Sequence, residues 1–186
     1  YINHKLLGTH IMPDDIILDF GCGTGTITLR MARHVNKMYG VDVSEGMLKR
    51  AQLKLENQNI NNAAFTKITA LEEMFGAESF TVITSFNVLQ YVENRKELFE
   101  QFYRLLKPGG SLIIAAPCFG ELNTLSAMYV RFLRFVRIMP ETYFFSIDEI
   151  EKEITDTGFT ITEGINLSDL PERIIVARKM VMEGDK

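Results

Sequence analysis

Glycines at alternate positions, with an acid on either side of them, point to nucleotide chemistry in this sequence. Gly21, Gly23 and Gly25 directly follow the apolar run Ile16–Phe20, and Asp42 comes twenty-one residues after Gly21. Glycines leave room for a ligand to approach backbone N–H groups, because a Cβ would block both the approach and the tight turn. A carboxylate about twenty residues further on can accept hydrogen bonds from both hydroxyls of a ribose.

The elements around these residues must bring them together. Ile16–Phe20 is typical of a buried strand, the segment from about Thr26 to Asn36 of a helix, and Lys37–Asp42 of a second strand. Asp42 then lies at a strand end, where its alternative role is to cap the next helix, although Ser44 is the better N-cap. Val43 and Met47 can supply an apolar surface for a base, and core packing is the competing role of Met47.

Motifs in matching order and spacing make the chain resemble a known family. Asp19–Gly25 (DFGCGTG), Gly40–Ser44 (GVDVS) and Leu106–Gly110 (LKPGG) are similar to motifs of the class I S-adenosylmethionine (SAM)-dependent methyltransferases, within a resemblance that covers roughly residues 11–179. The family is a type 11-like group that acts on small molecules. The resemblance implies a single domain over residues 1–186, folded as a three-layer α/β/α Rossmann-like sandwich. Its seven-stranded sheet would be mostly parallel, with the last strand antiparallel.

The resemblance, together with the strand-end argument, gives a set of expected cofactor-binding residues for SAM. These are Asp19, Gly21, Cys22, Gly23, Gly25, Asp42, Val43, Met47, Thr69, Ala70, Leu71, Ser85 and Asn87. Thr69 stands where many family members carry an acid that holds the adenine amino group, so a hydroxyl or backbone contact replaces that acid here. Thr81 likewise replaces a common acid at the start of the fourth strand, with a structural consequence expected.

The later strands place more polar residues at the same edge. Ser79–Ser85 is predicted as the fourth strand, and ligands of open α/β sheets bind beyond the carboxyl ends of strands. Ser85, Asn87, Gln90 and Tyr91 are therefore candidates to face the reacting methyl group, with a turn or core role as the alternative for each. The amphipathic helix from Arg95 to Leu106 is expected to end in the turn Lys107–Gly110.

The end of the chain predicts a further group of strands. Ser111–Ala116 is a continuous apolar run, typical of a strand buried on both faces. Gly158–Thr162 and Arg173–Arg178 follow a helix that Ser146 would cap, with Glu149 at the capping-box position. Two consecutive strands after a helix predict a hairpin, which the methyltransferase family has and a dehydrogenase Rossmann domain lacks.

Residues 117–145 depart most from the shared motifs and are predicted to form a helical cover over the acceptor. Tyr91, Tyr129, Phe132, Tyr143 and Phe144 are the candidate substrate-binding residues. Arg131, Arg134 and Arg137 recur every third residue, so they gather on one side of a helix. That row either binds an anionic or lipid-like acceptor or forms a solvated surface, which charge runs usually do. Contact with another subunit is a third interpretation of the segment.

Composition bounds the remaining choices. A chain of 186 residues fits one domain, and its net charge of −4 argues against a general nucleic-acid binder. Two cysteines give no disulfide framework, and no apolar run has the length of a membrane span or the form of a secretory signal. We therefore expect a cytoplasmic monomer or homodimer with no metal site. Residues 1–13, which include His4 and His10, are predicted to form a short helix, and a site role for either histidine is the minority interpretation.

The function predicted from these features is SAM-dependent methyl transfer to a small-molecule acceptor by SN2 displacement. No catalytic residue is assigned, since the methyl group is already activated by positive sulfur and a base is needed only for a protonated acceptor. Two alternatives are a non-catalytic SAM- or nucleotide-binding regulatory module and a nicotinamide-dependent oxidoreductase. The GxGxG spacing and the closing hairpin disfavour the oxidoreductase.

Overall fold

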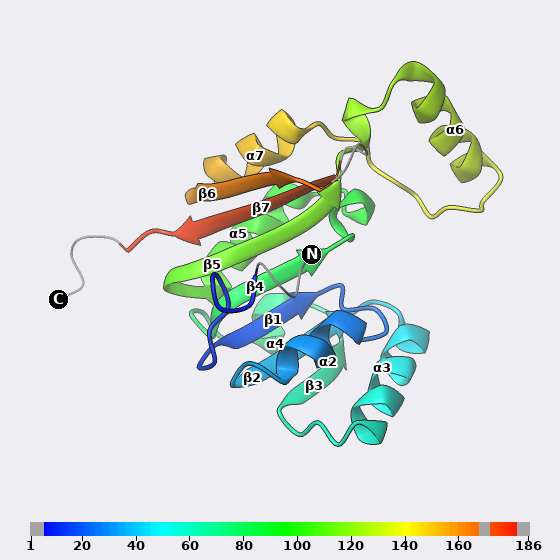
Figure 1. The fold of residues 1–186 in the computed structure, drawn as a ribbon. Helices are drawn as coiled ribbons and strands as arrows, with labels where there is room; N and C mark the ends of the chain where they lie inside the picture. Colours follow the sequence, from blue (N-terminus) through cyan, green and yellow to red (C-terminus); the bar gives the residue numbers. More distant parts are fainter. Residues whose placement is uncertain (1–5, 168–171, 182–186) are drawn as a thin grey trace.

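The described part of the chain forms one twisted sheet with helices on both faces (Figure 1). This computed structural model describes residues 6–167 and 172–181. Within them the strands are β1 (Ile16–Phe20), β2 (Lys37–Asp42), β3 (Ala63–Lys67), β4 (Phe80–Phe86), β5 (Leu106–Pro117), β6 (Phe159–Asn166) and β7 (Glu172–Lys179). The helices are α2 (Thr26–Ala32), α3 (Glu45–Asn57), α4 (Leu71–Met74), α5 (Arg95–Leu105), α6 (Thr124–Phe135) and α7 (Ile147–Asp156), with 3-10 turns η1 (Leu89–Tyr91) and η2 (Phe119–Glu121).

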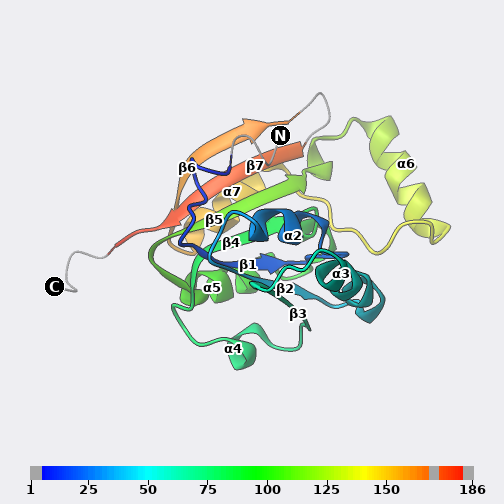
Figure 2. The ribbon, with the colours of Figure 1, turned by 60° about the horizontal axis from the view of Figure 1, so that its bottom comes forward.

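The described strands make a seven-stranded sheet in the order β3-β2-β1-β4-β5-β7-β6. The chain runs outward from β1 through β2 to β3, then returns to pair β4 with the other side of β1. The strand order therefore reverses between β1 and β4, and their carboxyl ends leave a crevice there. Figure 2 shows α2 and α3 together on one face of the sheet, with α5 on the other.

The predicted hairpin at the end of the sheet is present. β7 lies between β5 and β6 and runs antiparallel to both, while the pairs from β3 to β5 are parallel. The predicted sandwich, with a mostly parallel sheet and an antiparallel last strand, is the observed fold.

The two faces of the sheet bury different cores. The larger cluster packs α5 and α7 on the sheet and includes Phe80, Phe99, Phe102, Phe145 and Ile150. The opposite cluster lies beneath α2 and the start of the described chain, which contributes the buried side chains of Leu6 and Ile11. The expected helix at 1–13 is wrong for residues 6–13, which form turns around an isolated bridge from Leu7 to Ile11. Tight turns let these apolar side chains reach the sheet, whereas His4 lies outside the described residues.

β5 also begins earlier than predicted. Lys107–Gly110 was expected to be a turn before a strand at 111–116. The strand instead starts at Leu106, so residues 107–110 are part of it. The register passes from Phe80 opposite Leu106 directly to Val82 opposite Ser111, so the intervening residues bulge out of the ladder. A Cβ on Gly110 would lie 2.8 Å from the Lys107 carbonyl oxygen, and this crowding explains the glycine in the bulge.

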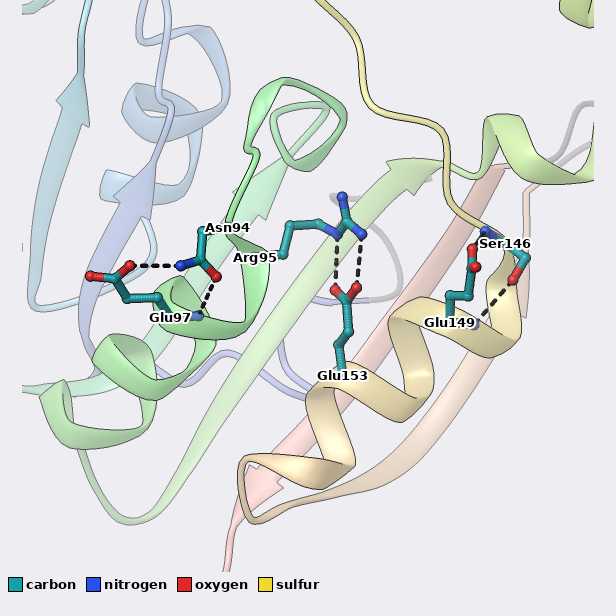
Figure 3. A network of polar contacts seen from close by, with 6 residues as sticks. All are labelled: Asn94, Arg95, Glu97, Ser146, Glu149 and Glu153. Atoms are coloured by element: carbon teal, nitrogen blue, oxygen red, sulfur yellow. Dashed lines mark hydrogen bonds and ion pairs between the residues drawn. The ribbon is translucent and has the colours of Figure 1, made fainter.

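Polar contacts fix α7 against α5 (Figure 3). Arg95 donates two hydrogen bonds to the Glu153 carboxylate, at 2.9 and 2.8 Å, and its guanidinium lies over the Phe145 ring. The predicted capping box at Ser146 is confirmed: its hydroxyl accepts from the Glu149 N–H, and the Glu149 carboxylate accepts from the Ser146 N–H. The ion pair joins the start of α5 to the second half of α7, and the capping box fixes where α7 begins.

In the part of the chain that the structure describes, no helix combines the length and apolar character needed to cross a bilayer. The same residues contain no group of three or more histidine, cysteine, aspartate or glutamate side chains placed to hold a metal ion.

A buried carboxylate links three elements of the fold. Asp19, at the end of β1, accepts hydrogen bonds from the hydroxyls of Thr28 on α2, at 2.5 Å, and Thr84 on β4, at 2.9 Å. Burial raises the pKa of Asp19 above its ordinary value, and the two hydroxyls only partly offset this. The network positions the first strand and the first helix on either side of the glycine loop.

We expect Asp19→Asn to remove a pH dependence from the stability of the protein. The pKa of Asp19 is higher in the folded state than in the unfolded state, so protonation of Asp19 stabilises the fold. This contribution is fully present below about pH 4 and is lost as the pH rises through the folded-state pKa. The free energy of unfolding of Asp19→Asn should therefore improve relative to wild type as the pH rises above about 4, as measured by urea titration at a series of pH values. The exposed Asp14→Asn is the control, and a constant difference for Asp19→Asn would contradict the raised pKa.

Candidate functional site

A cleft of about 330 Å³ opens at the crevice between the carboxyl ends of β1, β2 and β4. Its lining is mostly apolar, with one carboxylate, two hydroxyls and one amide among the side chains. The lining residues are Phe20, Gly21, Gly23, Val41, Asp42, Val43, Ser44, Met47, Ile68, Asn87, Val88 and Tyr91. Apolar walls with few polar groups are typical of a small-molecule or cofactor site.

The glycine loop forms one wall of the cleft, and two of its glycines have different reasons to be there. Gly21 has φ +75°, and a Cβ on it would lie 2.1 Å from a methyl carbon of Val88. Gly23 has φ +54°, and a Cβ on it would meet no atom within 4 Å. Gly21 is therefore required by packing, whereas the missing side chain of Gly23 leaves open space in the cleft.

Asp42 holds the loop from the end of β2. Its carboxylate oxygens accept hydrogen bonds from the Gly23 N–H at 2.9 Å and the Ser44 N–H at 2.8 Å. Ser44 caps α3, its hydroxyl accepting from the Met47 N–H, so the capping alternative for Asp42 is not needed. Each carboxylate oxygen keeps a second lone pair for a ligand hydroxyl.

Apolar side chains stand on either side of Asp42. Val43 and Met47 are exposed within the cleft, and Ile68, just after β3, lines it from the neighbouring strand. The three expected residues that follow Ile68 are not in the lining: Thr69 is exposed, Ala70 is half-buried, and Leu71 is buried in the core. The surface beside Asp42 therefore suits a planar apolar group such as a purine base.

Three expected residues lie behind the loop instead of facing the cleft. Asp19 is buried with its two threonine partners. The half-buried thiol of Cys22 has its pKa raised, first by burial and then by the Asp19 and Asp42 carboxylates, so it stays protonated. A Cβ on Gly25 would lie 2.5 Å from the Phe65 ring, so this glycine makes room for packing.

The end of β4 contributes the opposite wall. Asn87 lines the cleft with φ +57°, an uncommon conformation for a residue other than glycine, and Tyr91 on η1 lines it too. Ser85 is fully buried and not in the lining. Its hydroxyl, like the side-chain oxygen of Gln90, has no hydrogen-bond partner among the described residues.

The remaining substrate-binding candidates lie outside the cleft. Tyr129 and Phe132 are exposed on α6, which stands away from the sheet in Figure 1. Tyr143 and Phe144 are half-buried on the irregular segment between α6 and α7, where the Tyr143 N–H donates to the Gln90 carbonyl at 2.7 Å. Partial desolvation, followed by the nearby carboxylates of Glu141 and Glu93, raises the pKa of Tyr143.

His10 is also away from the cleft, with its ring nitrogen 2.7 Å from the Glu163 carboxylate on β6.

The stems of the segment that carries α6 meet at one point. The Gly120 N–H donates to the Phe145 carbonyl at 2.9 Å, and a Cβ on Gly120 would lie 2.6 Å from the Phe145 carbonyl carbon. The Phe119 and Phe144 rings pack nearby, with centroids 5.8 Å apart. Residues 121–144 thus leave and rejoin the domain at a tight backbone contact.

Sequence reasoning missed five lining residues: Phe20, Val41, Ser44, Ile68 and Val88. Phe20, Val41 and Ser44 adjoin residues that were predicted, so extending each motif by one or two positions would have found them. Ile68 follows the third strand at the same sheet edge as Asp42. Val88 carries no local signal, since its place depends on the contact with Gly21.

A protein-family model described as "Methyltransferase domain" matches residues 17–110, which contain the glycine loop, Asp42 and the end of β4. The ubiquinone/menaquinone biosynthesis C-methyltransferase of Hydrogenovibrio crunogenus is 26% identical over 89% of this chain and 74% of its own length. The chain spans only 20%, 49% and 40% of the length of three other curated relatives.

Solved structures agree with the fold. A SAM-dependent methyltransferase of Methanosarcina mazei has a TM-score of 0.77 and 22% identity, covering 96% of this chain and 98% of its own. The phosphoethanolamine N-methyltransferase 2 of Haemonchus contortus, solved with SAM, has a TM-score of 0.72 and 27% identity. That match covers 88% of this chain and 37% of the Haemonchus protein.

Replacing Gly21 or Gly23 with alanine should impair different properties of the protein, stability for Gly21 and ligand binding for Gly23. Gly23→Ala should fold, at a cost of about 1–2 kcal/mol for the left-handed conformation, and should lose ligand binding because its Cβ fills the cleft. Gly21→Ala should lower the melting temperature further, because Val88 must move. Thermal unfolding with and without SAM measures both effects, and a Gly23→Ala protein that SAM stabilises as it does wild type would contradict this geometry.

Proposed function

The chain belongs to the SAM-dependent methyltransferase family, and from that premise we propose that its cleft binds SAM and directs a methyl group to a small-molecule acceptor. The observation that carries the proposal is the open space at Gly23 beside the Asp42 carboxylate, both at the carboxyl edge of the sheet. A nucleoside needs such an acid for its hydroxyls and a Cβ-free backbone for its close approach.

The residues present fit the cofactor in chemical type. Asp42 would accept the ribose hydroxyls, and Val43, Met47 and Ile68 would enclose the adenine. Gly21 and Gly23 would border the remainder of the cofactor. Thr69, Ala70 and Leu71 would reach the base only through their backbone or, for Thr69, its hydroxyl.

The other expected residues divide into two groups in this proposal. Asn87, which lines the cleft, would face the reacting end of the cofactor, whereas Ser85 is buried beneath the cleft and would act only from behind its wall. Asp19, Cys22 and Gly25 would act indirectly by holding the loop, as their contacts behind the cleft suggest.

The chain's contribution to the reaction is alignment. SAM supplies a methyl group already activated by its positive sulfur. Tyr91 and the cleft walls would orient the acceptor and exclude water, and such positioning is worth about 7–11 kcal/mol in well-aligned reactions. Tyr143, with its raised pKa, stays a neutral hydroxyl and is no base near neutral pH. No side chain in the described lining is therefore assigned as a catalytic base.

We propose that residues 117–145 form the acceptor side of the site. Tyr143 and Phe144 adjoin η1, whose Tyr91 lines the cleft, so an apolar or anionic acceptor could extend from Tyr91 toward them. Tyr129 and Phe132 would contact the acceptor only if α6 moves toward the cleft or if the acceptor extends from the cleft as far as α6. Two relatives named above are a C-methyltransferase and an N-methyltransferase, so proteins similar to this chain methylate acceptors of different kinds.

A non-catalytic SAM-binding module is the remaining alternative. Incubating a metabolite extract with the protein and SAM should produce a compound heavier by one methyl group, detected by mass spectrometry. SAM binding without any such product would favour the binding module instead.

Asp42→Ala should weaken SAM binding about ten- to a hundredfold, since charge-assisted hydrogen bonds are worth about 1.5–3 kcal/mol. Calorimetric titration with SAM measures the effect, and NAD should give no binding heat with wild type. The exposed Asp14→Ala is the matched control. An unchanged Kd for folded Asp42→Ala would exclude the ribose role, and NAD binding without SAM binding would exclude the cofactor assignment.

Replacing Phe132 and Tyr143 together with alanine should raise the KM for the acceptor while leaving the Kd for SAM within about twofold, because neither side chain lines the described cleft. Steady-state kinetics with the unmethylated precursor of the compound found above give the KM, and calorimetric titration gives the Kd for SAM. Normal acceptor kinetics, with a changed oligomeric state in light scattering, would show that residues 117–145 form a subunit interface instead.

A further inference from the structure

The apolar side of α6 faces solvent. Leu125 is 79% exposed and Phe135 84% exposed, and Met128, Tyr129 and Phe132 between them are more than half exposed. These residues recur at spacings of three and four, so they share one side of the helix. The described structure buries no residue of α6. A surface helix usually turns such a stripe toward the core, and here the orientation is reversed.

The other side of α6 is the one that contacts the protein. Val130, Leu133 and Arg134 are half-buried, and the Arg134 guanidinium donates to the Thr142 carbonyl at 3.0 Å. The guanidinium of Arg131 lies 5.4 Å from the centre of the Phe144 ring. These contacts fix which side of α6 turns inward, so the exposure of the apolar stripe follows from the fold.

The charge of this segment is opposite to that of the chain. Residues 122–140 contain Arg131, Arg134 and Arg137 and no acidic residue, while the whole chain carries −4. Arg131 and Arg137 are exposed at the border of the apolar stripe, and exposed Ile138 continues that stripe past the helix end. An apolar face bordered by arginines suits the interface of an anionic bilayer, with the helix lying in the membrane plane.

We propose that α6 docks on anionic lipid bilayers, with its apolar stripe among the acyl chains and Arg131 and Arg137 at the headgroups. A second copy fits this face less well. A symmetric contact would bring equivalent arginines of both copies together. The two acids that flank residues 122–140 are already engaged, since Glu141 pairs with Arg134 at 3.2 Å and Glu121 accepts from the Ile147 N–H at 3.0 Å.

The position of α6 connects docking to the cleft. The segment that returns from α6 to the domain contacts η1, where the Tyr143 N–H bonds to Gln90 and the next residue, Tyr91, lines the cleft. Figures 1 and 2 both show α6 projecting beyond the body of the domain, so its outer face can meet a surface. The acceptor would then be an apolar molecule dissolved in the bilayer, an inference that rests on the proposed methyltransferase function.

Vesicle flotation with the full chain tests the docking. Wild type should float with vesicles of phosphatidylcholine containing about 30% phosphatidylglycerol, and much less with phosphatidylcholine alone. Leu125→Ser with Phe135→Ser should weaken partitioning about a hundredfold by removing buried apolar area. Arg131→Gln with Arg137→Gln should weaken it about thirtyfold on anionic vesicles only, and high salt should mimic this change in wild type.

Matched variants on α3 serve as controls. Leu53→Ser and Arg50→Gln change exposed residues of the same types and should float like wild type. All variants should keep the SAM affinity of wild type, which shows that they are folded. A wild type that floats without binding SAM would refute the proposed function and leave docking supported.

The opposite outcomes overturn the proposal. It fails if wild type does not float with anionic vesicles, or if the α6 variants float as well as the α3 controls. It fails in favour of a second copy if light scattering shows a dimer that Leu125→Ser with Phe135→Ser dissociates, without any vesicle binding.

Discussion

The hydrogen bond from the Gly23 N–H to the Asp42 carboxylate is the contact on which the site depends. It joins the loop after β1 to the end of β2, at the edge of the sheet where the cleft opens. The loop can make this bond only because its glycines take left-handed conformations. The same carboxylate accepts from the Ser44 N–H, so one side chain holds both the glycine loop and the residue that caps α3.

The proposed cofactor and acceptor sides of the site differ in how they are held. The proposed cofactor side consists of strand ends and a loop, with Asp19 and Phe65 packed behind the loop and Val88 packed against Gly21. The proposed acceptor side consists of η1 and the segment that carries α6, a helix with no buried residue in the described structure. A fixed cofactor surface beside a separately attached acceptor surface is consistent with a family in which one fold serves many acceptors.

The sequence predicts most of the fold because its signals are local. Alternating glycines, the Ser146 capping box and the apolar runs each specify their own conformation, and the closing hairpin follows from two strands after a helix. The early start of β5 was not predictable, because LKPGG is equally compatible with a turn and a bulge until Phe80 pairs with Leu106. In the site, Gly25 and Gly23 look alike in sequence, and only the tertiary contact with Phe65 separates packing from ligand space. The outward face of α6 was likewise invisible, since a helical period says nothing of which way the apolar side turns.

The backbone contact between Gly120 and Phe145 makes the intervening stretch exchangeable. With the two stems closed on each other, the length of chain between them has little effect on the domain, since loop-closure entropy changes slowly with the length enclosed. Insertions, deletions or replacement within residues 122–140, which leave the bond from Tyr143 to Gln90 in place, should therefore leave the sheet and the glycine loop undisturbed. If this segment contacts the acceptor as proposed, evolution can change the acceptor by altering it alone, and a protein engineer could graft a foreign recognition segment between the same stems.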